Sequence, residues 1–120
     1  MLGENPKRRL AERTVEYGLA AMEFCDKLPR SAVGQHICNQ LLRSATSVAA
    51  NYAEASEAES SADFVHKMKI ALKELKESRV WLLFAAHLLS GETVELLKKE
   101  SWELTRMISA SISTAKSRMP

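Results

Sequence analysis

Glycine, proline and cysteine are scarce in this chain. Its 120 residues include four Gly, three Pro and two Cys. So few turn-forming residues argue against a turn-rich β protein, and a content of 46% hydrophobic and 27% charged residues argues against a disordered tail. We therefore expect one folded, helical domain over residues 1–120, a common domain size.

Long apolar runs are also missing, and the N-terminal segment MLGENPKRRLAERT has no apolar centre of the kind found in secretory signals. No run approaches the roughly 20 residues that a helix needs to span a bilayer. Cys25 and Cys38 stand alone, without a C-x-x-C pair, so we expect small, reduced core residues in place of a disulfide or a metal pair. These absences favour a soluble protein of the cytoplasm.

Apolar residues recur at alternating steps of three and four, which predicts amphipathic helices over approximately 6–28, 32–55, 61–89 and 93–117. Short polar links join these segments, so neighbouring helices should be antiparallel. The predicted fold class is all-α, an up-and-down antiparallel four-helix bundle. The predicted core stripes are Leu10, Thr14, Tyr17, Ala21, Phe24 and Leu28; Ile37, Leu41, Ala45, Val48 and Tyr52; Phe64, Met68, Ala71, Leu75, Ser78, Leu82, Ala85 and Leu89; and Val94, Leu97, Ser101, Leu104, Ile108, Ser111 and Ala115.

Capping residues support these boundaries. Asn5 followed by Pro6 should begin the first helix, and Pro29 should end it. Gly91 suits the backbone that follows the third helix. The other predicted N-caps are Ser31, Ser60 in a capping box with Asp63, and either Ser90 or Thr93.

The end of the third segment is apolar on all sides. The stretch VWLLFAAHLL, residues 80–89, has one polar residue in ten, which is more apolar surface than one bundle stripe buries. Trp102 lies off the main stripe of the fourth segment and adds a large aromatic residue of the type enriched in interface cores. The alternatives are that charged side chains cover these residues, or that they fill a thick end of the monomer core. We expect a hydrophobic interface between copies of the chain, formed by Val80, Trp81, Phe84, Leu88 and Trp102.

A polar stripe runs along the second segment beside its apolar stripe. Its members are Gln40, Arg43, Ser47, Asn51 and Glu54, which are separated by three or four residues. Alanines lie among them, and small residues let a neighbouring backbone approach closely. A solvated face would need only residues such as Arg and Glu. We therefore expect structural or interface polar contacts here, between helices or between subunits, because buried polar groups without partners are costly.

Two blocks of sequence resemble a known family. QLLRSATSVAANYAEA resembles the signature Q-L-x-R-A-x-x-S-[IV]-x-A-N-[IY]-A-E of the bacterial 23S rRNA-intervening sequence protein family, and DFVHKMKIALKELKESRVWLLFA resembles its second block. The chain departs from many members by having Ala55 and the pair Lys73–Glu74 at positions where they have glycine or a Gly-Ser pair. The likeness extends over essentially the whole chain.

The resemblance implies an up-and-down bundle that assembles into a homopentameric ring, and it implies no reaction. A related group serves as the accessory protein of diversity-generating retroelements, where a basic pentamer engages reverse transcriptase and nucleic acid. The resemblance therefore implies that copies of the chain bind one another, and it leaves RNA or DNA open as a second partner.

Motifs for catalysis or for a cofactor are lacking. Four-helix bundles often hold metals through paired E-x-x-H motifs, and Asp63-x-x-His66 is the single near match. There is no G-x-S-x-G elbow and no glycine-rich phosphate loop. We expect a non-enzymatic protein with no cofactor, no metal and no small-molecule substrate, with His36 and His66 exposed and His87 partly buried.

Basic residues leave nucleic-acid binding open. Net charge is only +2, and acidic residues lie among the basic ones, so that pairs such as Lys73 with Glu77 are an adequate structural explanation. There is also no evident exposed aromatic platform for stacking bases. The two hypotheses are a homo-oligomeric interaction scaffold and a backbone-level RNA or DNA binder. The candidate phosphate contacts are Lys7, Arg8, Arg9 and Arg13 on the first helix and Lys69, Lys73 and Lys76 on the third.

Overall fold

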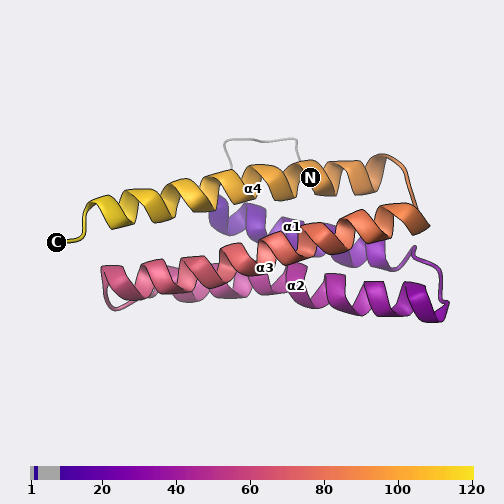
Figure 1. Ribbon diagram of the computed structural model, residues 1–120, viewed down its shortest axis with the longest axis horizontal. Helices are drawn as coiled ribbons and strands as arrows, with labels where there is room; N and C mark the ends of the chain where they lie inside the picture. The colour runs from indigo at the N-terminus through magenta and orange to yellow at the C-terminus, as the bar shows by residue number, and fades with distance from the viewer. Residues whose placement is uncertain (1, 3–8) are drawn as a thin grey trace.

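The computed structural model describes residue 2 and residues 9–120. This described part contains four α-helices and no β-strand: α1 (Leu10–Cys25), α2 (Ala32–Ser56), α3 (Ser61–Leu88) and α4 (Glu92–Ser117). The helices alternate in direction along an elongated body of 51 × 28 × 18 Å (Figure 1). Each helix contacts the next one along the chain, and α1 contacts α4. The predicted all-α, up-and-down four-helix bundle is therefore confirmed.

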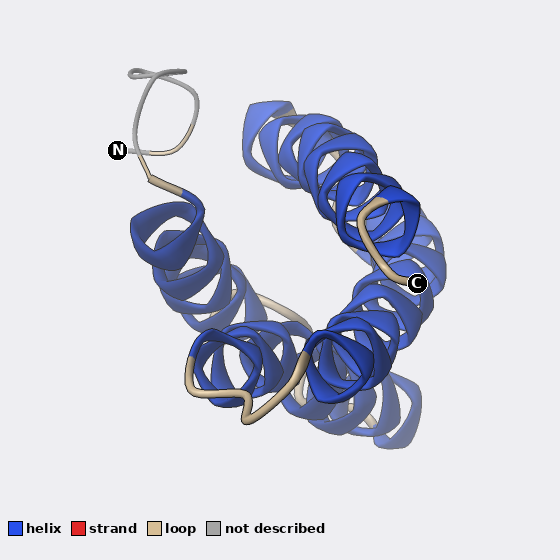
Figure 2. Ribbon diagram, turned by 90° about the vertical axis from the view of Figure 1, so that its left-hand side faces the viewer, coloured by secondary structure: helices blue, strands red, loops and turns tan. Residues whose placement is uncertain are grey.

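The predicted stripes form the core. Tyr17, Leu41, Leu75 and Leu104, one from each helix, are completely buried. Viewed from one end, the four helices lie around one centre, with the widest spacing between α1 and α4 (Figure 2). The buried side chains of all four helices belong to one hydrophobic core. Burial of a side chain of this size stabilises the fold by about 1.5–3 kcal/mol. Residues near the ends of the stripes are only partly buried, namely Leu10, Tyr52, Phe64, Leu89, Ser111 and Ala115.

The N-caps of α2 and α3 are the predicted ones. The Ser31 hydroxyl accepts a hydrogen bond from the Gly34 N–H at 3.1 Å, and the Ser60 hydroxyl accepts one from the Asp63 N–H at 3.0 Å. The Asp63 carboxylate accepts the N–H of Glu59 at 3.3 Å, one residue before the position of a standard capping box.

The N-cap of α4 differs from the prediction. Gly91 itself occupies this position, with φ of 140°, so neither Ser90 nor Thr93 is the cap. Side-chain-bearing residues rarely adopt this φ, which explains the glycine between α3 and α4.

Helix α1 starts later than predicted. The backbone of Arg9 is extended, with φ of −60° and ψ of 148°, so that α1 begins at Leu10. The predicted cap at Asn5 and Pro6 lies outside the described residues. With 16 residues, α1 is much shorter than the other described helices, which have 25 to 28. All three of these extend past α1 on the left of Figure 1.

A tight turn joins α1 to α2. The N–H groups of Lys27 and Leu28 bind carbonyl groups three residues earlier, at 3.0 and 3.1 Å, and this turn ends α1 at Cys25 instead of Leu28. Gly34, in the first turns of α2, packs against the turn. A Cβ atom on Gly34 would lie 1.9 Å from the carbonyl oxygen of Pro29. Glycine at this position therefore lets α2 start close to the end of α1.

Candidate interaction surfaces

The polar stripe of α2 lies along the seam between α2 and α3. Arg43 pairs with Glu74 at 3.0 Å and also with Glu77, and Glu54 approaches Lys67 at 3.4 Å. The side chain of Arg43 is half exposed, and exposed ion pairs of this kind contribute about 0–1 kcal/mol each. Arg43 and Glu54 therefore make helix-to-helix contacts within one chain.

Two other members of the stripe form hydrogen bonds inside α2. The Ser47 hydroxyl donates to the carbonyl of Arg43 at 2.6 Å, and the Asn51 amide donates to the carbonyl of Ser47 at 2.9 Å. Gln40 is half-buried. Ser47 and Asn51 thus need no neighbouring subunit to satisfy their hydrogen bonds, and a role of this stripe between subunits stays a prediction.

Arg13 lies in a buried ion pair between α1 and α4. Arg13 is 5% exposed and Glu100 is 3% exposed. The guanidinium donates to both carboxylate oxygens of Glu100, at 2.9 and 2.5 Å, and to Glu103 at 3.1 Å. The hydrogen bonds to Glu100 raise the pKa of the Arg13 guanidinium above its usual value, although burial opposes this rise. The prediction that Arg13 contacts phosphate is therefore wrong, because its side chain is buried against two carboxylates.

An apolar hollow lies where α2 begins and α3 ends. The ring centroids of Trp81 and Phe84 are 5.7 Å apart, and Trp81 meets His36 edge-on with 5.6 Å between the ring centroids. Val80 and Leu83 continue this apolar surface along α3, and Val80, Leu83 and Phe84 are 49–54% exposed. The hollow has a volume of about 500 Å³ and is lined by Ala32, Val33, His36, Ile37, Trp81 and Phe84.

The other predicted interface residues are partly covered by their own chain. Trp81 and Leu88 both pack against the core. Trp102 is about half exposed, and the guanidinium of Arg79 lies 4.3 Å from the centre of its ring. Cover by a charged side chain, one of the two alternatives to an interface, therefore applies to Trp102. Val80 and Phe84 keep a large exposed area.

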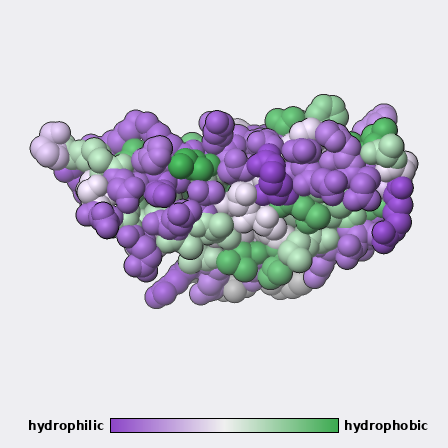
Figure 3. All heavy atoms as spheres, turned by 90° about the horizontal axis from the view of Figure 1, so that it is seen from below, coloured by the Kyte–Doolittle hydropathy of each residue, from purple (hydrophilic) through white to green (hydrophobic). Residues whose placement is uncertain are grey.

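A second apolar surface lies on α1, and the prediction did not include it. Val15, Leu19 and Met22 are 48–51% exposed on the outside of the bundle. Their spacing of four and three residues was a usable signal in the sequence, because it repeats the period of the core stripe on the same helix. Figure 3 shows hydrophobic side chains in separate groups on one face of the bundle, among hydrophilic ones.

The predicted phosphate contacts are only partly brought together. Lys7 and Arg8 lie outside the described residues, and Arg9 is exposed at the start of α1. On α3, Lys69, Lys73 and Lys76 are all exposed. None of these three lysines forms an ion pair in the described part of the chain.

Two observations change the expected charge pairing on α3. Glu77 pairs with Arg43 of α2 and accepts a hydrogen bond from the Trp81 indole at 3.1 Å, so the expected pair with Lys73 is not formed. Lys116 of α4 lies beside Lys69, and this neighbouring ammonium group lowers the pKa of Lys69. An excess of positive charge therefore lies along the seam between α3 and α4.

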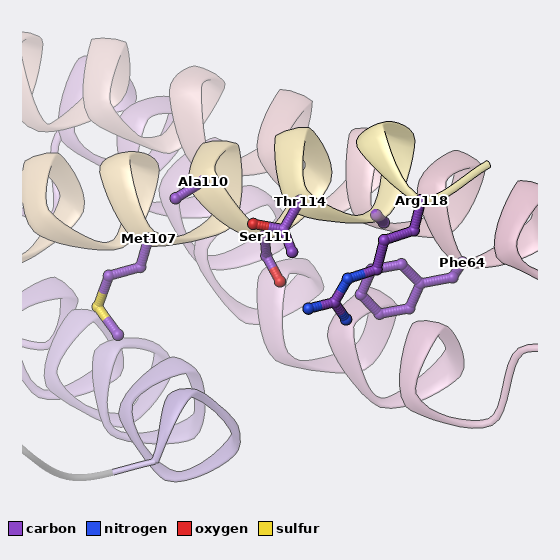
Figure 4. Close-up of a pocket in the computed structure, with 7 residues that line it drawn as sticks. Phe64, Met107, Ala110, Ser111, Thr114 and Arg118 are labelled. Carbon is purple, nitrogen blue, oxygen red and sulfur yellow. The ribbon is translucent and has the colours of Figure 1, made fainter.

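A shallow hollow of about 360 Å³ lies at the end of the bundle that α1 does not reach. Figure 4 shows its lining, with Phe64 on α3 and Met107, Ser111, Thr114 and Arg118 on α4. Small and apolar groups line most of it, and Arg118 is the charged group among the lining residues. This combination offers neither a nucleophile with a base nor a set of metal ligands.

Groups suited to metal or acid–base chemistry are dispersed. Within residue 2 and residues 9–120, no three His, Cys, Asp or Glu side chains lie close enough to hold a metal ion. His36, His66 and His87 are exposed, so the prediction of a partly buried His87 is wrong. No helix among the described residues has the length and apolar character needed to cross a membrane.

Burial suppresses the ionisation of two core groups. It raises the pKa of Tyr17 to about 12, and the Tyr17 hydroxyl is 2.7 Å from that of Ser78. Burial also raises the pKa of the Cys25 thiol to about 12, and this thiol lies 3.8 Å from the carbonyl oxygen of Cys38. A thiol with so high a pKa is a poor nucleophile, which suits the predicted structural role of Cys25.

Comparisons with known proteins agree with this description. The model of the 23S rRNA-intervening sequence protein family matches residues 8–110. A solved structure, of a protein of unknown function from the S23 ribosomal protein family of Bacteroides thetaiotaomicron VPI-5482, is 28% identical and has a TM-score of 0.76, with 87% of this chain and 98% of that chain covered. None of the curated proteins matches the chain. Because the family match covers most of the sequence, the chain belongs to the 23S rRNA-intervening sequence protein family.

Proposed function

We propose that this protein is a non-enzymatic interaction scaffold of the cytoplasm that works as a homo-oligomer, with a ring of five copies favoured by the family resemblance. The observation that carries the proposal is the half-exposed apolar surface around Phe84 with its hollow of about 500 Å³. Large exposed apolar patches mark interaction sites in folded proteins. A second copy of the chain would remove this surface from water.

The oligomer should dissociate when this surface is made polar. We expect the unmodified protein to have a mass in light scattering several times that of its 13.4 kDa chain. Val80→Lys with Phe84→Lys should reduce the mass to that of one chain, because two charges would be buried without partners. Thr93→Lys with Leu96→Lys, at exposed positions of α4, is the matched control and should leave the mass unchanged. An unmodified protein that stays a single chain at every concentration would refute the proposal.

Binding to the backbone of RNA or DNA is a second candidate. The observation in its favour is the contact between Lys69 and Lys116, which come from different helices. A phosphate group placed between two ammonium groups would relieve their repulsion. Lys73 extends the positive surface along α3.

Salt dependence tests this candidate. Affinity for RNA of mixed sequence, measured by fluorescence anisotropy, should fall steeply as salt rises from about 50 mM. Lys69→Glu with Lys116→Glu should weaken binding for all sequences and reduce the slope of log affinity against log salt by about 2. Lys27→Glu with Lys99→Glu makes the same charge change at other exposed sites and should have a smaller effect. If the unmodified protein retains no RNA at about 50 mM salt, this candidate is excluded.

A further inference from the structure

The two exposed apolar surfaces lie on different helices and differ in shape. The α1 outer face consists of Val15, Leu19 and Met22 with the acidic residues Glu23 and Asp26, and it lies on the outside of a single helix. The α3 outer face consists of Lys73, Lys76, Val80, Leu83 and Phe84, and it borders the hollow between α2 and α3. Of the α3 outer face only Phe84 lines this hollow, so the hollow of about 500 Å³ is a recess beside one end of the face that an apolar side chain of a neighbouring helix can enter.

Charge distinguishes the two faces as well. The charged members of the α1 outer face carry carboxylates, and Lys73 and Lys76 of the α3 outer face carry ammonium groups. Glu77 lies beside these lysines on α3, but its carboxylate is paired with Arg43 of α2. Two α1 outer faces brought together would oppose carboxylates, and two α3 outer faces would oppose lysines. Like charges opposed across an interface cost up to several kcal/mol. Pairing of one face with the other joins unlike charges around an apolar centre.

We infer that the α1 outer face of one copy binds the α3 outer face of the next copy, so that the chain associates front to back. This inference rests on the proposed self-association and adds to it the identity of the two contacting surfaces. A front-to-back contact leaves one free face at each end of a pair, so further copies add until a ring closes or a filament grows. A two-fold dimer would instead use the same face twice and stop.

Mixing two defective variants tests this pairing. The first variant carries Leu19→Lys and Met22→Lys, and the second carries Val80→Lys and Phe84→Lys. All four positions are about half exposed and helical, so both variants should keep the helical circular dichroism of the unmodified protein. Each variant alone should have the mass of one chain. An equimolar mixture should form a dimer of twice 13.4 kDa and no larger species, because one intact pair of faces remains while the two altered faces repel each other.

The possible outcomes separate this inference from the proposed function. If the unmodified protein is oligomeric but the mixture stays at the mass of one chain, the pairing of these two faces is refuted, and self-association through other surfaces stands. If the first variant keeps the mass of the unmodified protein, the α1 outer face takes no part and the inference fails. If either variant alone forms a dimer, the faces pair with themselves. If the unmodified protein is a single chain at all concentrations, both ideas fail together. Leu19→Gln with Met22→Gln repeats the test without added charge.

Discussion

Replacing Arg13 with methionine is expected to lower the free energy of unfolding by about 3–5 kcal/mol, the usual cost of removing one partner from a buried ion pair. The change would leave the carboxylate of Glu100, which is 3% exposed, without its bidentate partner. The contact between α1 and α4 is also the least extensive of those between neighbouring helices. Loss of this ion pair should therefore weaken the packing of the first turns of α1 against α4.

Urea unfolding, followed by circular dichroism at a fixed protein concentration, measures this effect. The double variant Arg13→Met with Glu100→Leu should recover much of the loss, because it replaces the pair by apolar groups of similar size and leaves no unpaired charge. Arg43→Met is the matched control: it removes a half-exposed arginine from the pairs with Glu74 and Glu77, and it should cost no more than about 1 kcal/mol. If Arg13→Met and Arg43→Met are equally mild, the ion pair to Glu100 does not have the role described.

Substitution of Gly34 by alanine should have an effect of similar size. The added methyl group would lie 1.9 Å from the carbonyl oxygen and 2.9 Å from the carbonyl carbon of Pro29. Both atoms belong to the backbone of the turn between α1 and α2, so the turn or the start of α2 must move. We expect a loss of about 3 kcal/mol, at the upper end of overpacking effects.

Gly18 provides the matched control for Gly34. It is also a buried helical glycine, but a methyl group there would meet its nearest neighbour, Thr46, at 3.6 Å, which is ordinary contact. Gly18→Ala should therefore stabilise the protein by up to about 1 kcal/mol, because alanine favours the helical backbone. Both variants are compared by their urea midpoints. If Gly34→Ala unfolds at the same urea concentration as the unmodified protein, Gly34 does not lie as close to the Pro29 carbonyl group as described.

The helices and the core were predictable because they depend on local periodicity. Steps of three and four place residues such as Tyr17, Leu41 and Leu75 on one side of each helix, whatever the packing partner is. Helix ends were less predictable. The end of α1 at Cys25 depends on hydrogen bonds in the turn, and Gly91 caps α4 through a backbone angle that the sequence does not specify.

Pairing between helices could not be predicted from the sequence. Arg13 lies 87 positions before Glu100, and only the relative alignment of α1 and α4 brings them together. From local spacing, Glu77 was expected to pair with Lys73, whereas the structure pairs it with Arg43 across the α2–α3 seam. A single sequence shows which side of a helix a charge occupies, but not which residue of the neighbouring helix lies opposite.

Because α1 is short, one end of the bundle should unfold locally more readily than its centre. Past the start of α1 at Leu10, the last turns of α4 lack this neighbour within the described part of the chain. Local unfolding of these last turns of α4 exposes less apolar area than local unfolding at the centre of the bundle, so it costs less free energy. Deuterium should enter the amides around Ser111–Ser117 well before those around Leu97–Leu104.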